Sequence, residues 1–154
     1  MRDHNTDIEV YIRPYARVAP YAEHVDLDSL QAGVDGDNLR YLEAKTDKRF
    51  EIVINLPASY RMDAEECIQM MVTFDGGPVL TDRIIEQMDR ADCGKTTVNI
   101  DSTILCFNHT QTSHAMTFGK LLAAPDCTMS DSQSLQEMWT RGKIEVKMFR
   151  GELL

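Results

Sequence analysis

The chain has little positive charge for its size. Its 154 residues include 16 lysines and arginines against 25 aspartates and glutamates, which gives a formal net charge of −9. Nucleic acids and anionic bilayers both reward clustered cations, so this balance argues against general binding to either. An acidic surface instead suits a soluble domain, or one with a basic protein partner. We therefore expect no membrane partner, and nucleic acid is disfavoured as a ligand.

Long apolar runs are absent as well. No stretch approaches the roughly 20 apolar residues that a helix needs to cross a bilayer. The opening MRDHNTDIEV lacks the hydrophobic region of a secretory signal. None of the four cysteines forms a CxxC pair, so without a signal we expect free thiols in a reducing compartment. These features predict an intracellular protein, either cytoplasmic or nuclear.

Motifs for nucleotide or calcium binding are incomplete. Cys93–Thr97 resembles the end of a P-loop, but Asp89 occupies the position where the motif needs its first glycine. Asp35–Asn38 resembles part of a calcium loop, but Leu42 stands where that loop needs its last glutamate. Both segments are better interpreted as solvated turns.

Catalytic and zinc-binding patterns are missing too. The sequence contains no GxSxG serine elbow, and its carboxylates are dispersed over turns and exposed strand faces. Cys106, His109 and His114 lie close together, but no pair has the spacing typical of a zinc site. We therefore expect no metal and no cofactor, and no residue stands out as catalytic. An enzyme stays open as an alternative.

Strand alternation dominates what the sequence does contain. Within Leu39–Pro57 we predict a hairpin whose first strand holds Tyr41 and Leu42 and whose polar turn is Thr46–Lys48. Its second strand has a clean period of two and ends at proline, which has no N–H for a ladder. On that strand, Phe50, Ile52, Ile54 and Leu56 are expected to face the core, and Arg49, Glu51, Val53 and Asn55 to face solvent or a partner.

The rest of the chain supplies further short strands. Helices are expected to be few and short, at Ser132–Trp139 and, unless the preceding strand continues, at Ile84–Arg90. His109–His114 is expected to be a polar loop. The further predicted strands are Ile8–Arg13, Cys67–Phe74 before a glycine-rich turn at Asp75–Pro78, Thr96–Phe107 with a break at Asp101-Ser102, and Lys143–Arg150.

This pattern predicts an all-β fold. Seven or eight short strands with turn signals between them are typical of an antiparallel β-sandwich, with a jelly-roll order as one arrangement. The chain shows no βαβ rhythm, no internal repeat and no linker. We therefore expect residues 1–154 to form one β-sandwich domain with one or two short helices.

Large side chains mark the expected binding residues. Phe149 falls on the face opposite the inward set of the last strand, and Tyr11 does the same on the first strand. Trp139 is the single tryptophan. Exposed aromatics of this kind anchor protein interfaces, so Tyr11, Trp139 and Phe149 are the predicted partner-binding residues.

Four stretches carry a family resemblance. They are IEVYIR, YLEAKTDKRFEIVI, VTFDGGPV, and MTFGKLL with the closing GKIEVKMFRGEL. In this order they resemble an uncharacterised family of fungal proteins with an N-terminal β-sandwich domain of unknown function. The resemblance implies the fold and transfers no catalytic residue. The family's pattern is matched here by Phe50-Glu51-Ile52, Thr73-Phe74-Asp75-Gly76, Met116-Thr117-Phe118, and Gly142–Val146 with Arg150.

Taken together, these features favour a non-catalytic module for protein–protein interaction or self-association, acting through an exposed strand edge or face. One alternative is an acidic β-sandwich chaperone for basic proteins such as histones. Another is an enzyme or small-ligand binder that uses the sandwich interior, with two of His24, His109, His114, Asp101 or Cys106 in a deep polar pocket. A third is a secreted fungal effector that uses the sequon Asn108-His109-Thr110.

Overall fold

The fold is seen in a computed structural model that describes residues 6–24, 39–63, 66–75, 77, 79–86, 95–107, 110–119 and 142–152. Side chains are described throughout except at 80–82, 105–107, 110 and 111. The described part contains strands and no helix, so the prediction of an all-β fold is confirmed. The strands are β1 (Glu9–Pro14), β2 (Glu23–His24), β3 (Tyr41–Leu42), β4 (Phe50–Leu56), β5 (Glu66–Phe74), β6 (Val79–Glu86), β7 (Thr96–Ile100), β8 (Ser102–Phe107), β9 (Thr110–Ala115) and β10 (Ile144–Glu152).

Strand β4 is the centre of the first sheet. It pairs antiparallel with β1 on one side and with β7 on the other, so that Val10, Ile54 and Val98 form one cross-strand row. The predicted hairpin of Leu39–Pro57 is therefore wrong in its pairing. Strand β3 instead pairs with β2, in a separate two-stranded sheet. The predicted turn is present, with Asp47 at a φ of 57° and Lys48 N–H donating to the Lys45 carbonyl at 3.0 Å.

The second sheet has the order β10-β5-β6, with both pairings antiparallel. Strands β5 and β6 form the hairpin that the Asp-Gly-Gly-Pro signal predicts. Asp75 enters the turn at a φ of 53°, a left-handed conformation that aspartate tolerates better than most residues. A register shift at Val72/Thr73 marks a bulge next to the turn.

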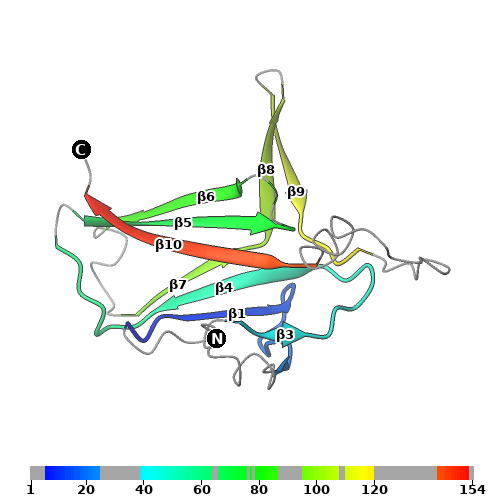
Figure 1. The fold of residues 1–154 in the computed structure, drawn as a ribbon, viewed down its shortest axis with the longest axis horizontal. Helices are drawn as coiled ribbons and strands as arrows, with labels where there is room; N and C mark the ends of the chain where they lie inside the picture. Colours follow the sequence, from blue (N-terminus) through cyan, green and yellow to red (C-terminus); the bar gives the residue numbers. More distant parts are fainter. Residues whose placement is uncertain are drawn as a thin grey trace, which may run out of the picture.

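The remaining hairpin joins β8 to β9. Strand β7 ends at Ile100 and β8 begins at Ser102, so the predicted break at this point is confirmed. The prediction of a polar loop at His109–His114 is wrong over Thr110–His114, which lies in β9 and pairs with β8. This strand has no apolar alternation, and its place in a ladder comes from its partner strand. Figure 1 shows the β8-β9 hairpin projecting from the two larger sheets.

One hydrophobic cluster draws side chains from both three-stranded sheets. The first sheet contributes its inward set from β1, β4 and β7, and the second contributes Ile68, Met70, Val72 and Ile85. Figure 1 shows β10, β5 and β6 running alongside β7, β4 and β1. The described residues thus share a core between two antiparallel sheets. The sandwich arrangement, the jelly-roll order and the single domain stay predictions.

The second face of β4 departs from the sequence pattern. Glu51, Val53 and Asn55 were expected to face solvent or a partner, but all three are buried, and Val53 has no exposed surface. The polar pair is tolerated because each member meets a cross-strand neighbour. Arg13 Nε donates to Glu51 Oε1 at 2.8 Å, and Asn55 Nδ2 donates to Glu9 Oε2 at 2.9 Å. Buried polar groups satisfied in this way cost far less than unpaired ones.

Neither expected helix is present in the described part. Ile84–Glu86 continue strand β6, and Ile85 is buried in the core while Ile84 faces outward. The rest of Ile84–Arg90, and all of Ser132–Trp139, lie outside the described residues. In the part of the chain that the structure describes, no helix is long and apolar enough to cross a membrane.

An exposed ion pair closes one end of the second sheet and predicts a response to acid. Arg150 Nε donates to Glu66 Oε1 at 2.7 Å, and this contact lowers the pKa of Glu66 below its ordinary 4.5. A carboxylate whose pKa is lower in the folded chain stabilises the fold above its unfolded pKa, and that contribution disappears as pH falls through the folded value. We expect the thermal midpoint of Glu66→Gln to lie below that of the wild type at pH 7. The gap should narrow below about pH 4.5, and a gap that does not change with pH would contradict this.

Candidate functional site

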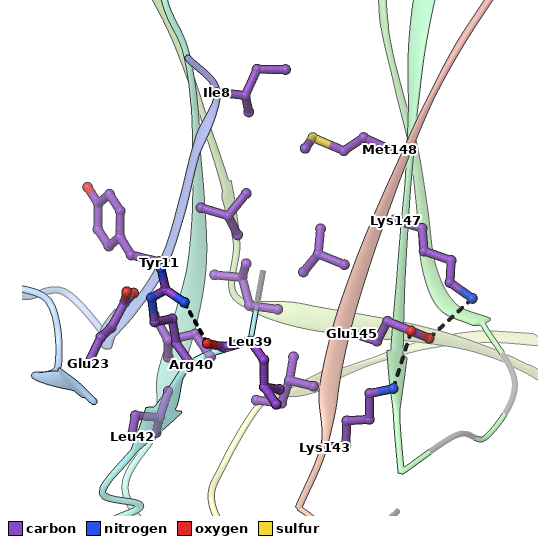
Figure 2. A pocket seen from close by; sticks show the side chains of 15 residues that line it. Ile8, Tyr11, Glu23, Leu39, Arg40, Leu42, Lys143, Glu145, Lys147 and Met148 are labelled. Atoms are coloured by element: carbon purple, nitrogen blue, oxygen red, sulfur yellow. Dashed lines mark hydrogen bonds and ion pairs between the residues drawn. The ribbon is translucent and has the colours of Figure 1, made fainter. Parts of the chain in front are cut away.

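The candidate site is a groove between two strands at sheet edges. β1 borders the first sheet and β10 borders the second, and among the described strands each has one partner. Figure 2 shows the two strands on opposite sides of the groove, with Ile8 and Met148 at one end and Leu42 and Lys143 at the other. The groove has a volume of about 440 Å³. We call it the edge groove.

The walls of the edge groove are apolar. On the side of the first sheet the groove is lined by Ile8, just before β1, and Val10, both buried in the core, and by Ile12, which is half-buried. β10 contributes Ile144, Val146 and Met148, which are half-buried, whereas Val72 and Met70, the β5 partners of the last two, have no exposed surface. Apolar side chains left partly uncovered between two strand edges are suited to a ligand that covers them.

Charged side chains form the rim. Glu145 is held between two lysines, with Lys143 Nζ at 3.4 Å and Lys147 Nζ at 3.2 Å from its carboxylate oxygens. These contacts, that of Lys147 foremost, lower the pKa of Glu145 below its ordinary value, so it is an anion near neutral pH. Glu23 and Arg40 lie on the opposite side. A rim of both signs orients a peptide more readily than it selects a single ion.

The backbone of β10 adds a directional feature. In the described part of the chain, its nine residues pair with β5 alone. The other edge of an antiparallel strand presents every second N–H and C=O outward, ready to pair with one more strand. The edge of β1 is partly used, because the Ile12 carbonyl accepts a hydrogen bond from Tyr21 N–H at 2.9 Å. β10 is therefore the better template.

The predicted partner-binding residues do not meet at one place. Tyr11 lies at the margin of the edge groove, although its ring lies on the side of β1 away from β10 (Figure 2). Phe149 is 48 % exposed on the outer face of the second sheet, in a row with Gln69 and Ile84. Trp139 lies outside the described residues. The exposure expected for Phe149 is present, but that residue does not line the groove.

The described residues among those named for an enzyme site do not line the edge groove. His24 is exposed on β2, and His114 is exposed on β9, where its ring nitrogen lies 3.0 Å from the Thr112 hydroxyl. Asp101 contacts Arg49 and Ser102 near the surface. His109 and the side chain of Cys106 lie outside what is described.

The described residues also hold no cluster of potential metal ligands. Among the described residues, no three His, Cys, Asp or Glu side chains stand together as ligands would. Cys67, the cysteine whose side chain is described, is a buried free thiol on β5. The edge groove offers apolar contacts, rim charges and backbone pairing, which is the chemistry of binding.

Sequence reasoning missed the residues that make the groove. The sequence predicts a hairpin strand for the stretch with Leu39 and Leu42, and it places Val146 and Met148 on the inward face of the closing strand. A pattern of period two shows which side chains face inward, but not which strand lies at the edge of a sheet. One signal was available in the sequence: the closing strand alternates as cleanly as the opening strand. This is what two strands that both lie at the edge of a sheet would show.

Comparison with known proteins gives a family and no function. No curated protein and no solved structure matches the chain. The fungal source expected from the resemblance stays a prediction. A sequence family described as a domain of unknown function, DUF7918, matches residues 10–154, which include every strand from Val10 of β1 to β10. The chain therefore belongs to the DUF7918 family of domains of unknown function.

Proposed function

We propose that this domain is a protein-interaction module whose edge groove receives an extended segment of a partner chain. The segment adds to the free edge of β10 by backbone hydrogen bonds and places alternate apolar side chains against Val146 and Met148. The observation that carries the proposal is the apolar groove between two edge strands, one of which has an unused edge in the described part of the chain. Strand addition is a common way for β domains to bind peptides.

The size of the groove sets the expected ligand. A volume of about 440 Å³ is enough for a few side chains, and not for a folded partner. An extended strand places alternate side chains on one face, at a rise of about 3.3 Å per residue. We therefore expect a segment of about five to seven residues with two or three apolar side chains at alternate positions.

The proposal is tested by selecting peptides from a display library against the full chain. The affinity of the selected peptides is then compared between two matched variants. Leu39 is 40 % exposed on the groove, so Leu39→Glu adds a charge there with little effect on the core. Ile104 is exposed on β8, away from the groove, and Ile104→Glu is the control. We expect Leu39→Glu to lower the affinity for the selected peptides at least about tenfold, because the added carboxylate would lose its hydration against the apolar side chains of the peptide. Ile104→Glu should leave the affinity within about twofold.

Two results would overturn the proposal. One is that the selection yields no peptide that binds in solution. The other is that both variants weaken binding equally. The peptide would then bind elsewhere, or the added negative charge would explain the loss of affinity wherever it stands. Circular dichroism of both variants would establish that the comparison is between folded proteins.

A further inference from the structure

A second hollow, of about 420 Å³, is surrounded by positive charge. It lies at the end of the first sheet where Pro14 of β1 pairs with Phe50 of β4. The turn that follows β1 and the turn that precedes β4 therefore lie side by side. We call this site the basic hollow, and its lining comprises Tyr15, Arg17, Tyr21, Lys45, Lys48 and Arg49 beside Pro14.

The composition of the lining is unusual for this chain. Four of the 16 lysines and arginines gather at one hollow of a molecule whose formal net charge is −9, and none of its lining residues is acidic. In the described part of the structure, no ion pair engages Arg17, Lys45 or Lys48. Like charges held close together repel one another, and a bound anion would relieve that repulsion.

Backbone hydrogen bonds hold the two turns in place. Tyr15 N–H donates to the Arg49 carbonyl at 3.0 Å, and Phe118 N–H donates to the Lys48 carbonyl at 3.1 Å. Asp47 N–H in turn donates to the Phe118 carbonyl at 2.9 Å. The backbone that carries the cations is therefore held in place by hydrogen bonds. The free-energy cost of bringing the cations together is part of the folding of the chain and not of ligand binding.

Arg49 of the basic hollow is oriented by stacking on Tyr15. The Arg49 guanidinium lies 3.7 Å from the centre of the Tyr15 ring, and one of its nitrogens lies 3.5 Å from Asp101. Stacking occupies a face of the guanidinium and leaves N–H groups at its edge for an oxyanion. Carboxylates and phosphates are the groups that fit such an edge.

The basic hollow and one end of the edge groove are lined by residues that are close together along the chain. β1 supplies Ile12 to the groove and Pro14 to the hollow, and the segment that leads from β3 to β4 supplies Leu42 to the groove and Lys45 to the hollow. A fully extended chain spans at most about 3.6 Å per residue. The Cα atoms of Ile12 and Pro14 therefore lie within about 7 Å of each other, and those of Leu42 and Lys45 lie within about 11 Å. One extended ligand can therefore contact both sites.

We propose that the basic hollow binds the acidic end of the same extended protein segment that the edge groove receives. This rests on the function proposed above and adds the class of partner: a short apolar strand flanked by glutamates or aspartates. Nucleic acid is the less suitable ligand, because a net charge of −9 repels a long polyanion. A short acidic segment feels mainly the local cations, within a screening length of about 8 Å.

Binding of a glutamate peptide to the isotope-labelled full chain tests the hollow by itself. The probe has about eight glutamates and no apolar residue, so its binding does not depend on the edge groove. We expect amide shifts at Tyr15, Arg17 and Lys48, and binding that weakens as salt is added. Lys45→Ser/Lys48→Ser should weaken it at least about tenfold.

The control has the same charge change elsewhere. Arg61 and Lys95 are exposed and line neither site, so Arg61→Ser/Lys95→Ser should leave affinity within about twofold. Equal weakening by both double variants would overturn the proposal, because net charge would then explain the binding. Shifts confined to other residues would overturn it as well, and so would tighter binding of a single-stranded oligonucleotide to the same residues.

The link between the two sites has a separate test. Glutamates appended to a peptide selected for the edge groove should raise its affinity at least about fivefold for the wild type, and not for Lys45→Ser/Lys48→Ser. If no such peptide exists, the proposed function fails while the glutamate-peptide result still stands. If the peptide binds but appended glutamates change nothing, the acidic-end proposal fails and the edge groove remains.

Discussion

Val53→Asp is expected to lower the free energy of unfolding by at least about 3 kcal/mol. Val53 lies in the middle of β4 with no exposed surface, opposite Tyr11 and Asn99 in the ladders. An aspartate there would bury a charge without a cation opposite it in register, and desolvation of an unpaired polar group is costly. Urea unfolding followed by circular dichroism measures the change.

The control for this prediction is a second valine. Val18 is 89 % exposed, so Val18→Asp should change the free energy of unfolding by less than about 0.5 kcal/mol. The pair of variants separates two interpretations of β4. If Val53→Asp proved as mild as Val18→Asp, the second face of this strand would face solvent, as its alternating sequence suggests, and the described packing would be wrong.

Arg13→Met is expected to cost about 2 kcal/mol. The change keeps most of the apolar stem of Arg13 but leaves the carboxylate of Glu51, whose side chain is only 7 % exposed, without the cation that lies 2.8 Å away. Glu51 in turn raises the pKa of Arg13 above its ordinary value, which agrees with a favourable charged pair. The cost is below that of a fully buried pair, because the Arg13 side chain keeps 19 % exposure.

A double-mutant cycle gives this prediction its control. Adding Glu51→Gln to Arg13→Met removes the stranded charge, so the double variant should recover part of the lost stability. Lys147→Met, which breaks a contact with Glu145 between exposed side chains, should have little effect. Additive losses in the cycle would show that Arg13 and Glu51 do not interact, contrary to the structure.

Strand positions could be predicted because their signal is local. Alternation placed strands over Ile8–Arg13, Cys67–Phe74 and Lys143–Arg150, and each agrees within two residues with a strand of the structure. The break at Asp101 and the turn at Asp75 were found for the same reason, since turn chemistry depends on a few neighbouring residues.

Strand partners could not be predicted, because pairing depends on segments far apart in the chain. A turn between Tyr41 and Phe50 suggested that their strands would pair, yet β4 pairs with β1 and β7 instead. The polar face of β4 was misjudged for a related reason. Glu51 and Asn55 look like solvated residues until Arg13 and Glu9 are known to lie opposite them.

The candidate site could not be predicted from the sequence either, because it too depends on how distant strands pair. A groove between edge strands can be recognised only when the strand order is known, and nothing in the β10 sequence indicates that β5 is its single neighbour among the described strands. Phe149 was found to be exposed, as its parity on the strand predicted. Among the cations of the basic hollow, Arg17 is distant in sequence from Lys45, Lys48 and Arg49, so their convergence follows from the pairing of Pro14 with Phe50.

Amide hydrogen exchange along β10 tests the central proposal most directly. With a selected peptide bound, every second amide of Ile144–Glu152, those directed away from β5, should exchange more slowly than in the free protein. The amides of the β6 and β7 edges should keep their rates. Unchanged exchange along β10, with protection at the edge of β6 or β7 instead, would contradict the edge groove as the binding site.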